Sequence, residues 1–283
     1  MHSENFGHNT LTNSRKGRRF LAGILFPVLF FLFGTSAFSQ TLEVGLFGGG
    51  SYYIGDLNPS TPFVNTQIAY GVLVRYNLDE RWALKLGVTR GMIKGNSSNT
   101  TFLPDRELRF ESPVSDISAV VEFNFFKYFT GSKHNWITPY LFAGIGAFLY
   151  EPVAGGAKLR ALGTEGQNIG YLGRKPYSST GLSIPFGVGV KASLTKRLAL
   201  GAYWEMHKTF TDYLDDISTT YYLNGPVIDP NVPEQFLSDP PMTHEQGMQR
   251  GNSKSKDWYS FAGITLTYRF DLRKSKRCRD LKH

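Results

Sequence analysis

The sequence predicts an all-β protein, a transmembrane antiparallel up-and-down β-barrel of eight strands. Three observations predict this fold. Apolar residues alternate with small or polar ones along successive segments, short and long connections between these segments alternate, and an export signal precedes the first segment. Alternation with a period of two indicates a strand with two different faces. In a membrane barrel the apolar face meets lipid and the other face lines the interior.

The N-terminus carries the three regions of a secretory signal. Residues 15–19 contain four basic residues, residues 20–33 are almost entirely apolar, and Ala37 and Ser39 are small residues three and one positions before Gln40. We therefore expect residues 1–39 to be a cleaved signal peptide. An uncleaved membrane helix is the alternative, because the apolar run approaches the ~20 residues that span a bilayer.

The predicted organisation continues with a barrel over residues 40–270 and a basic periplasmic tail over residues 271–283. The net charge of +8 is concentrated at the two ends, with +3 in residues 1–39 and +4 in residues 271–283, which leaves +1 for the barrel. A nearly neutral body argues against binding of nucleic acid. The tail is either a solvated end or a handle for an acidic periplasmic partner or anionic lipid headgroups. Its Cys278 is the only cysteine, so no internal disulfide forms.

Eight segments carry the strand pattern, six of them clearly. The clear segments are residues 68–76, 82–88, 117–125, 184–190, 198–206 and 258–270, and the less regular ones are residues 42–53 and 137–150. The glycine run at residues 48–50 lacks the lysine and helix of a phosphate-binding loop. We interpret it as a distortion of the first strand.

The face opposite the apolar one mixes glycine with charged residues. These are Glu43, Arg75, Lys85, Glu122, Lys191, Glu205 and Arg269. An eight-stranded barrel has an interior just wide enough for side chains to fill. We therefore expect these residues to form ion pairs that plug the lumen, which favours a packed barrel over a channel.

The connections are expected to alternate between short periplasmic turns and long external loops. The turns are predicted at residues 77–80, around residues 131–132 and at residues 194–196, and the loops at residues 54–66, 95–113, 151–179 and 209–257. An even number of strands places both termini in the periplasm. Backbone groups cannot stay unpaired in lipid, so the sheet has to close.

Aromatic residues cluster near the predicted strand ends, where they are expected to form interfacial girdles. Those toward the turns are Tyr76, Trp82, Phe125, Phe126, Trp136 and Phe270, and those toward the loops are Tyr52, Tyr53, Trp204 and Trp258.

The sequence offers little catalytic chemistry, and we expect no enzyme activity, no cofactor and no metal. Glu205 and His207 share one strand face, so a lipid hydrolase or acyltransferase is a minor alternative. Asp212, Asp215 and Asp216 form the densest acidic group. Calcium binds such oxygens, but the spacing matches no known loop, and we favour a role in capping the loops or docking a partner.

Several segments resemble one family of barrels. They are residues 47–58, which contain Tyr-Ile-Gly-Asp-Leu-Asn, residues 139–146 and 184–191, and residues 209–221, which contain Thr-Asp-Tyr-Leu-Asp-Asp. Together they resemble the PorG-like outer-membrane barrels of the Bacteroidetes type IX secretion system, over most of residues 41–270. The basic tail is not part of the resemblance.

The resemblance implies a non-enzymatic scaffold in a machine for protein transport and gliding motility. Its implied partners are outer-membrane lipids and a periplasmic ring of the PorK and PorN type, with neither nucleic acid nor a small-molecule substrate. The candidate docking or loop-ordering residues are Tyr53, Asp56, Asn58, Asp212, Tyr213, Asp215 and Asp216. A free-standing structural or adhesive barrel with ligand-binding loops is the main alternative.

Overall fold

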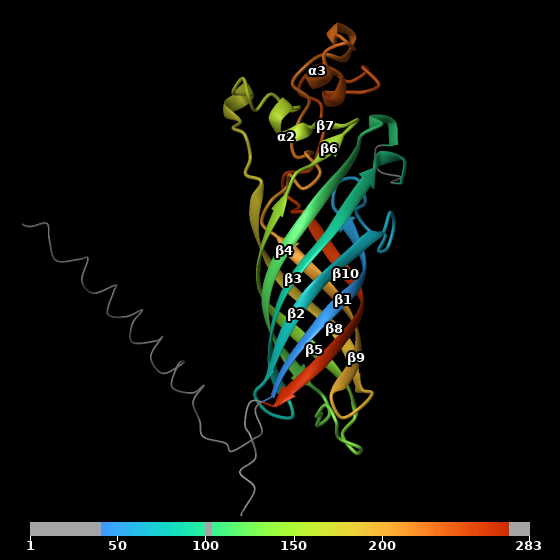
Figure 1. Cartoon of the computed structure of the whole chain (residues 1–283). Helices are drawn as coiled ribbons and strands as arrows, with labels where there is room; N and C mark the ends of the chain where they lie inside the picture. The colour runs from blue at the N-terminus through green and yellow to red at the C-terminus, as the bar shows by residue number, and fades with distance from the viewer. Residues whose placement is uncertain (1–40, 100–103, 272–283) are drawn as a thin grey trace, which may run out of the picture. The chain divides into compact units, whose positions relative to one another are not determined.

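The computed structural model describes residues 41–99 and 104–271, which form a closed antiparallel barrel of eight long strands (Figure 1). Its strands are β1 (Thr41–Ile54), β2 (Gln67–Asn77), β3 (Trp82–Asn96), β4 (Arg109–Asn124), β5 (Ile137–Tyr150), β8 (Thr180–Ser193), β9 (Leu198–Thr209) and β10 (Trp258–Asp271). Each long strand pairs with the next, and β1 pairs with β10 to close the ring. The predicted fold class is confirmed. The predicted signal peptide, and the predicted tail beyond Asp271, lie outside the described residues.

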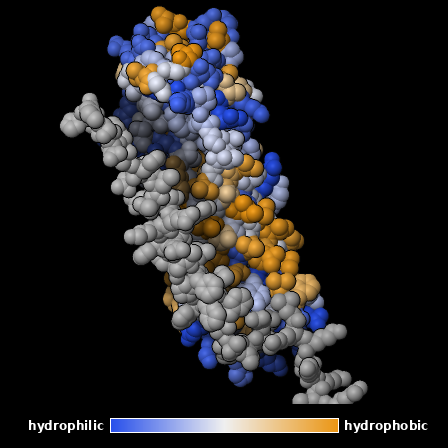
Figure 2. Space-filling model, turned by 90° about the vertical axis from the view of Figure 1, so that its left-hand side faces the viewer, coloured by the Kyte–Doolittle hydropathy of each residue, from blue (hydrophilic) through white to orange (hydrophobic). Residues whose placement is uncertain are grey.

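The two faces of the barrel differ as the alternation predicts. In β2 the side chains of Ile68 and Val72 are 81% and 53% exposed, whereas Leu73, between the outward positions, is 4% exposed. In the view of Figure 2, hydrophobic residues gather over the middle of the barrel and hydrophilic ones lie at both ends. An apolar surface this continuous is stable in lipid and not in water. Among the described residues, no helix combines the length and apolarity of a membrane span.

Strands β3 and β4 are longer than predicted, and the loop between them is correspondingly shorter. We expected a loop over residues 95–113, but pairing continues to Asn96 and Arg109. The apolar alternation stops earlier because the outer face of this extension is charged. Lys94 and Glu111, for example, form an exposed ion pair at 2.9 Å. Backbone pairing between β3 and β4 therefore extends beyond the apolar residues from which the strands were predicted.

The glycine run in β1 is not a distortion, so that prediction is wrong. The pairing of residues 48–50 is continuous with β10 on one side and with β2 on the other. The glycines allow close approach instead. A Cβ on Gly49 would lie 2.2 Å from the carbonyl oxygen of Ala262, and Gly49 is directly paired with Gly263.

The aromatic girdle is present at the turn end but differs from the prediction at the loop end. Tyr52 and Tyr53 are fully buried. Tyr52 points outward but is covered by the ring of Phe63, 4.9 Å away, and its hydroxyl accepts a hydrogen bond from Trp204 at 2.8 Å. Tyr53 points inward because successive residues of a strand face opposite sides. Neither is therefore part of a lipid-facing girdle.

The long loops fold together over one end of the barrel (Figure 1). They contain the short strands β6 (Val153–Ala154) and β7 (Ala157–Lys158) and the helices α2 (Leu159–Leu162) and α3 (Pro233–Ser238). They also contain the 3-10 turns η1 (Ser97–Asn99), η2 (Pro104–Arg106), η3 (Tyr171–Gly173) and η4 (Gly225–Val227). β6 pairs with β4 at Glu111 and Val153, so the ordered loops continue the barrel wall. We call this region, residues 55–66, 97–99, 104–108, 151–179 and 210–257 with the adjoining strand ends, the cap.

A charge placed on the lipid face should destabilise the barrel. Ile145 lies in the second half of β5 with 73% of its surface exposed. We expect Ile145→Arg to lower the free energy of folding into lipid vesicles by about 2–4 kcal/mol, the cost of a cation near the bilayer midplane. Ile169→Arg, on the similarly exposed Ile169 of the cap, is the matched control and should leave stability unchanged. Equal stability of the two variants in vesicles would contradict a lipid-facing β5.

Candidate functional site

Four of the predicted lumen residues meet in one buried ionic cluster. The carboxylate of Glu122 accepts hydrogen bonds from Arg75 at 2.9 Å and from Lys191 at 2.8 Å. Arg75 also donates to Glu43 at 2.9 Å. The four residues come from β1, β2, β4 and β8, and none of their side chains is more than 3% exposed. The cluster therefore ties opposite walls of the barrel together through its interior.

A second cluster lies nearer the cap. Lys85 donates to Glu205 at 3.2 Å. The ring of His207 lies between two carboxylates, with Nε2 3.4 Å from Glu205 and Nδ1 3.5 Å from Asp116. Tyr259 donates to Asp116 at 2.8 Å, and its ring stacks on that of His207 at 4.4 Å.

Aromatic rings fill the space around these charges. The Nζ of Lys85 lies 4.5 Å from the ring of Phe142 and 4.6 Å from that of Tyr203. The Nζ of Lys191 lies 4.8 Å from the ring of Tyr140, for which Gly189 leaves room, since a Cβ there would lie 2.6 Å from the ring. Cations over aromatic faces are attracted by the ring quadrupole. The interior is thus packed with charges that are paired and with rings that pack against them.

The connection over residues 125–136 folds back into the turn end of the barrel. Tyr128 and Thr130 are buried there, and Thr130 donates to Glu43 at 2.6 Å. Arg269 differs from its predicted role in a lumen ion pair. It is the third residue from the end of β10, where it pairs with the exposed Asp271 at 3.1 Å and donates to the carbonyl of Thr130. Its position at the barrel mouth keeps it out of the glutamate cluster.

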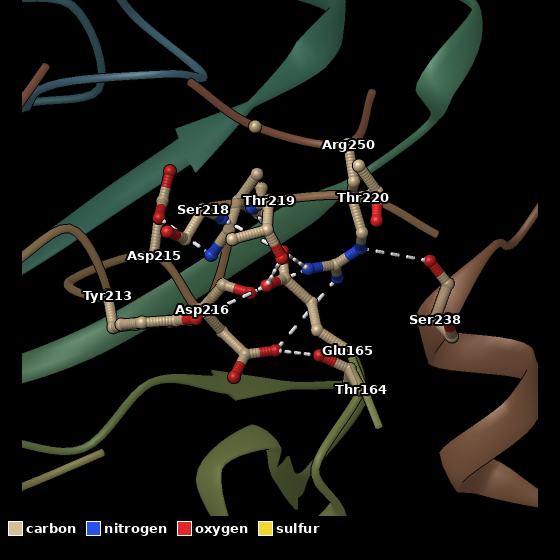
Figure 3. A network of polar contacts seen from close by, with 12 residues as sticks. Thr164, Glu165, Tyr213, Asp215, Asp216, Ser218, Thr219, Thr220, Ser238 and Arg250 are labelled. Atoms are coloured by element: carbon tan, nitrogen blue, oxygen red, sulfur yellow. Dashed lines mark hydrogen bonds and ion pairs between the residues drawn. The ribbon is translucent and has the colours of Figure 1, made fainter. Parts of the chain in front are cut away.

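The cap has a buried ionic centre of its own, built on Glu165 and Arg250 (Figure 3). Arg250 donates to Glu165 at 3.2 Å, to the carbonyl of Asp216 at 2.6 Å and to that of Ser238 at 3.1 Å. Glu165 also accepts hydrogen bonds from Thr219, at 3.0 Å from its backbone and 2.6 Å from its hydroxyl. Because both charged groups are satisfied, the two long loops are held against each other. We call these residues the Glu165–Arg250 cluster.

The two sequence motifs meet next to this cluster. The hydroxyl of Tyr53 lies 2.5 Å from a carboxyl oxygen of Asp215 and 3.0 Å from one of Asp257. A single hydroxyl proton cannot serve both carboxylates, and burial raises the pKa of Asp215 and of Asp257, each reinforced by nearby acids. Both carboxyl groups therefore bind a proton more readily than an ordinary aspartate does.

The remaining motif residues also order the loops. Gly55 and Asn58 exchange backbone hydrogen bonds at 3.1 and 3.0 Å, and the side chain of Asn58 donates to the carbonyl of Tyr53 at 2.8 Å. Asp56 accepts from the backbone of Asn252 at 2.8 Å. Tyr213 stacks on Tyr177 at 4.6 Å. Buried inside the cap, most of these side chains are not available to a partner, so the geometry corresponds to loop ordering.

Asp212 and Asp216 hold protons more strongly than ordinary aspartates. Burial raises the pKa of Asp212 to about 7, although Ser218 donates to it at 2.7 Å. Burial raises the pKa of Asp216 to about 6, although Arg250 opposes the change. Tyr177 donates to Asp216 at 2.7 Å. Within the described part of the chain, no group of three His, Cys, Asp or Glu side chains is arranged to hold a metal ion.

Sequence reasoning missed several central residues. Glu165 and Arg250 lie in loops without periodicity and 85 positions apart, so no sequence pattern marked them. Asp257 immediately precedes β10 and could have been found as an acid at a strand boundary. Asp116 could have been found from the alternation, because it lies on the inward face of β4 in the extension that the apolar pattern did not cover.

A closed eight-stranded sheet with an apolar exterior, a packed ionic interior and a folded cap defines a transmembrane β-barrel of the outer-membrane type. The chain belongs to the family described as Domain of unknown function (DUF6089), which matches residues 22–221 and thus includes both motifs. No curated protein matches the sequence.

Solved structures with a similar fold include three bacterial proteins. Ail, the attachment invasion locus protein of Yersinia pestis, is 9% identical with a TM-score of 0.42, covering 82% of this chain and 99% of its own. The N-terminal β-barrel domain of Pseudomonas aeruginosa OprF is 13% identical with a TM-score of 0.38, covering 81% and 97%. Neisserial surface protein A is 10% identical with a TM-score of 0.40, covering 83% and 100%. Identities this low carry no information about function.

Removing the central lumen anion should cost far more than removing an exposed one. Glu122→Gln leaves Lys191 buried without its anionic partner, and breaking a buried pair costs about 3–5 kcal/mol. Glu111→Gln, which breaks the exposed pair with Lys94, should cost about 0–1 kcal/mol. Urea-dependent unfolding from lipid vesicles measures both. Adding Lys191→Met to Glu122→Gln should recover part of the loss, and equal losses in the two single variants would refute a structural lumen cluster.

The cap should be more stable in mild acid than at alkaline pH. The pKa of Asp212 rises from 3.8 to about 7 on folding, so the folded state binds the proton more tightly than the unfolded state. The contribution of Asp212 to the stability of the folded cap is therefore fully present below about pH 3.8 and is lost as the pH rises toward about 7. Above that pH the stability no longer changes through this group. We expect cleavage within residues 210–257 to be several-fold faster at pH 8 than at pH 5, after normalisation to an unstructured peptide. Asp212→Asn should reduce the difference in cleavage rate between pH 5 and pH 8. An unchanged difference would show that groups other than Asp212 cause the pH dependence.

Proposed function

We propose that this barrel is an outer-membrane scaffold subunit of a type IX protein secretion and gliding motility apparatus, docking a periplasmic ring of the PorK and PorN type. The observation that carries the proposal is the contact between the two motifs that resemble the PorG-like family. Tyr53 of the first motif and Asp215 of the second form one buried site, although they are 162 positions apart. The two motifs that resemble the PorG-like family thus build one structural centre. This supports the proposal that the barrel shares its architecture with that family.

The packed interior supports a scaffold role over a pore. Charged side chains from four strands meet across the barrel, and aromatic rings occupy the space between them. A scaffold needs a rigid transmembrane anchor, which ion pairs buried in a closed sheet supply.

In the proposed orientation, both termini and the short turns face the periplasm. A ring would then meet residues 78–81, 125–136 and 194–197. Exposed lysines lie in these turns, among them Lys133 and Lys196. An acidic surface on the ring would complement them.

Deletion of the gene tests the proposal. Secretion of cargo with a C-terminal export signal should stop, and the wild-type gene should restore it. Capture of the barrel from detergent extracts, followed by mass spectrometry, should recover the ring proteins. Unimpaired secretion together with capture of the barrel alone would refute the scaffold role.

A pair of charge reversals sharpens the docking test. Lys133→Glu combined with Lys196→Glu changes the turn end, whereas Lys254→Glu changes an exposed residue of the cap. We expect at least about a tenfold loss of ring proteins from the captured complex for the turn-end variant, equivalent to 1.4 kcal/mol. The cap variant should behave as wild type. The reverse result would place the partner on the loop side.

A free-standing structural or adhesive barrel is the second candidate, favoured by the ordered cap. The Glu165–Arg250 cluster fixes the long loops in one arrangement, as a ligand-binding surface requires. Normal secretion in the deletion strain with loss of surface adhesion would favour this candidate.

We also propose that the barrel has no lipid-modifying activity. His207 lies between Glu205 and Asp116, and Ser183 is 3.3 Å from its Nδ1, so a carboxylate competes with the serine for that nitrogen. The three residues around His207 are at most 3% exposed, namely Glu205, Asp116 and Ser183. Lipid profiles of strains carrying His207→Ala or Glu205→Ala should match the wild type, and an altered acyl composition would reverse this proposal.

A further inference from the structure

A cavity of about 330 Å³ lies in the cap beside the Glu165–Arg250 cluster. It is bounded by the ends of β3 and β4, by α2 and by α3. Its apolar walls come from Leu108, Leu159 and Ile217, each at most 4% exposed, and from the partly buried Phe236 and Leu237. These residues belong to three different loops, so the cavity exists only when the cap is folded.

One wall of the cavity carries a polar group that lacks a partner. Ser97 is 1% exposed, and within the described residues its hydroxyl makes no hydrogen bond. Its backbone N–H is already used by the carbonyl of Leu108 at 2.9 Å. A buried hydroxyl without a partner is energetically costly, because it has lost its hydrogen bonds to water. A ligand with its own hydroxyl groups would remove this cost.

The floor of the cavity offers no free charge. Arg250 is compensated by Glu165 at 3.2 Å (Figure 3). Asp215 is hydrogen-bonded to Tyr53 at 2.5 Å. At the mouth, Glu107 and Arg109 are exposed and of opposite sign. A phosphate or carboxylate would therefore find no buried uncompensated cation here, only the exposed Arg109 at the mouth. The mouth supplies both acceptors and donors, which suits an uncharged ligand with several hydroxyl groups.

The backbone at the mouth is strained. Glu107 has a φ of 50°, a left-handed conformation that is unfavourable for a residue with a side chain. Such strain is often found at ligand clamps. The strained backbone, the cavity and the unpartnered hydroxyl together favour a binding site over a packing defect. The volume is at the lower end of the about 300–1,000 Å³ usual for ligand pockets.

We propose that this cavity binds one neutral sugar unit, either free or as the terminal unit of a surface glycan. A sugar ring places C–H groups against the walls formed by Leu108, Leu159 and Phe236, while its hydroxyls reach Ser97 and the residues at the mouth. An aliphatic peptide side chain would fill the walls but leave Ser97 unpaired. The proposal is independent of the secretion role.

Titration calorimetry on the full barrel tests the proposal. The barrel is purified in a detergent without a sugar headgroup, such as lauryldimethylamine oxide, and titrated with a panel of neutral hexoses, N-acetylhexosamines and their disaccharides. Glycan released from lipopolysaccharide of the parent strain forms a second arm. Binding of free sugars identifies a free ligand, and binding of the released glycan alone identifies a surface glycan. Absence of binding in both arms overturns the proposal.

Three variants link binding to the cavity. Leu237→Trp fills it from α3 and should abolish binding, while Val227→Trp, at a residue of the same loop that is 71% exposed, is the control. Ser97→Ala should weaken binding about five- to tenfold, the loss of one net hydrogen bond. Unheated gel mobility verifies that each variant is folded. Sugar binding that survives Leu237→Trp unchanged would place the site elsewhere and overturn the proposal.

Discussion

A bilayer provides no water to hydrogen-bond a strand, so the seam between β1 and β10 is the contact on which the rest of this structure depends. Fourteen residue pairs, from Thr41 with Asp271 to Ile54 with Trp258, join the first strand to the last. Once the ring is closed, the inward-facing side chains are removed from both lipid and water. Their charges then have to be compensated within the barrel, because an isolated buried ion is prohibitively costly. The clusters around Glu122 and Glu205 are a consequence of closure.

Closure also explains the difference between the two ends. At the turn end, the short connections leave a mouth that one segment, residues 125–136, fills with Tyr128 and Thr130. At the loop end, water is again available, and the connections are long enough to build a second core. That core follows the same electrostatic rule as the lumen. Glu165 and Arg250 are buried together, and each is satisfied by several further hydrogen bonds.

The strands and their inward-facing positions could be predicted from the sequence, because both follow from the alternation of apolar and polar residues. Alternation identified six of the long strands clearly and the other two less regularly, and the inward positions of Arg75 and Glu122 follow from it directly. It failed where two aromatic residues are adjacent, because Tyr52 and Tyr53 are equally apolar and the pattern does not say which one faces inward. It also failed in the charged extension of β3 and β4, where pairing continues without an apolar face. Alternation could not predict the structure of the cap, because contacts such as that of Glu165 with Arg250 join residues in loops, 85 positions apart.

The position of Tyr53 connects the barrel to the cap. Tyr53 is near the exit of the first strand, and Asp257 immediately precedes the last, so the two approach each other only across the closed seam. Asp215 then adds the long loop to the same hydroxyl at 2.5 Å. The junction between barrel and cap at Tyr53 is therefore assembled from residues 204 and 162 positions away in the sequence. Because Tyr53 is near the end of β1 and Asp257 immediately precedes β10, the hydrogen bond between them requires these two strands to be paired, so the part of the cap that depends on this hydrogen bond depends on a closed seam.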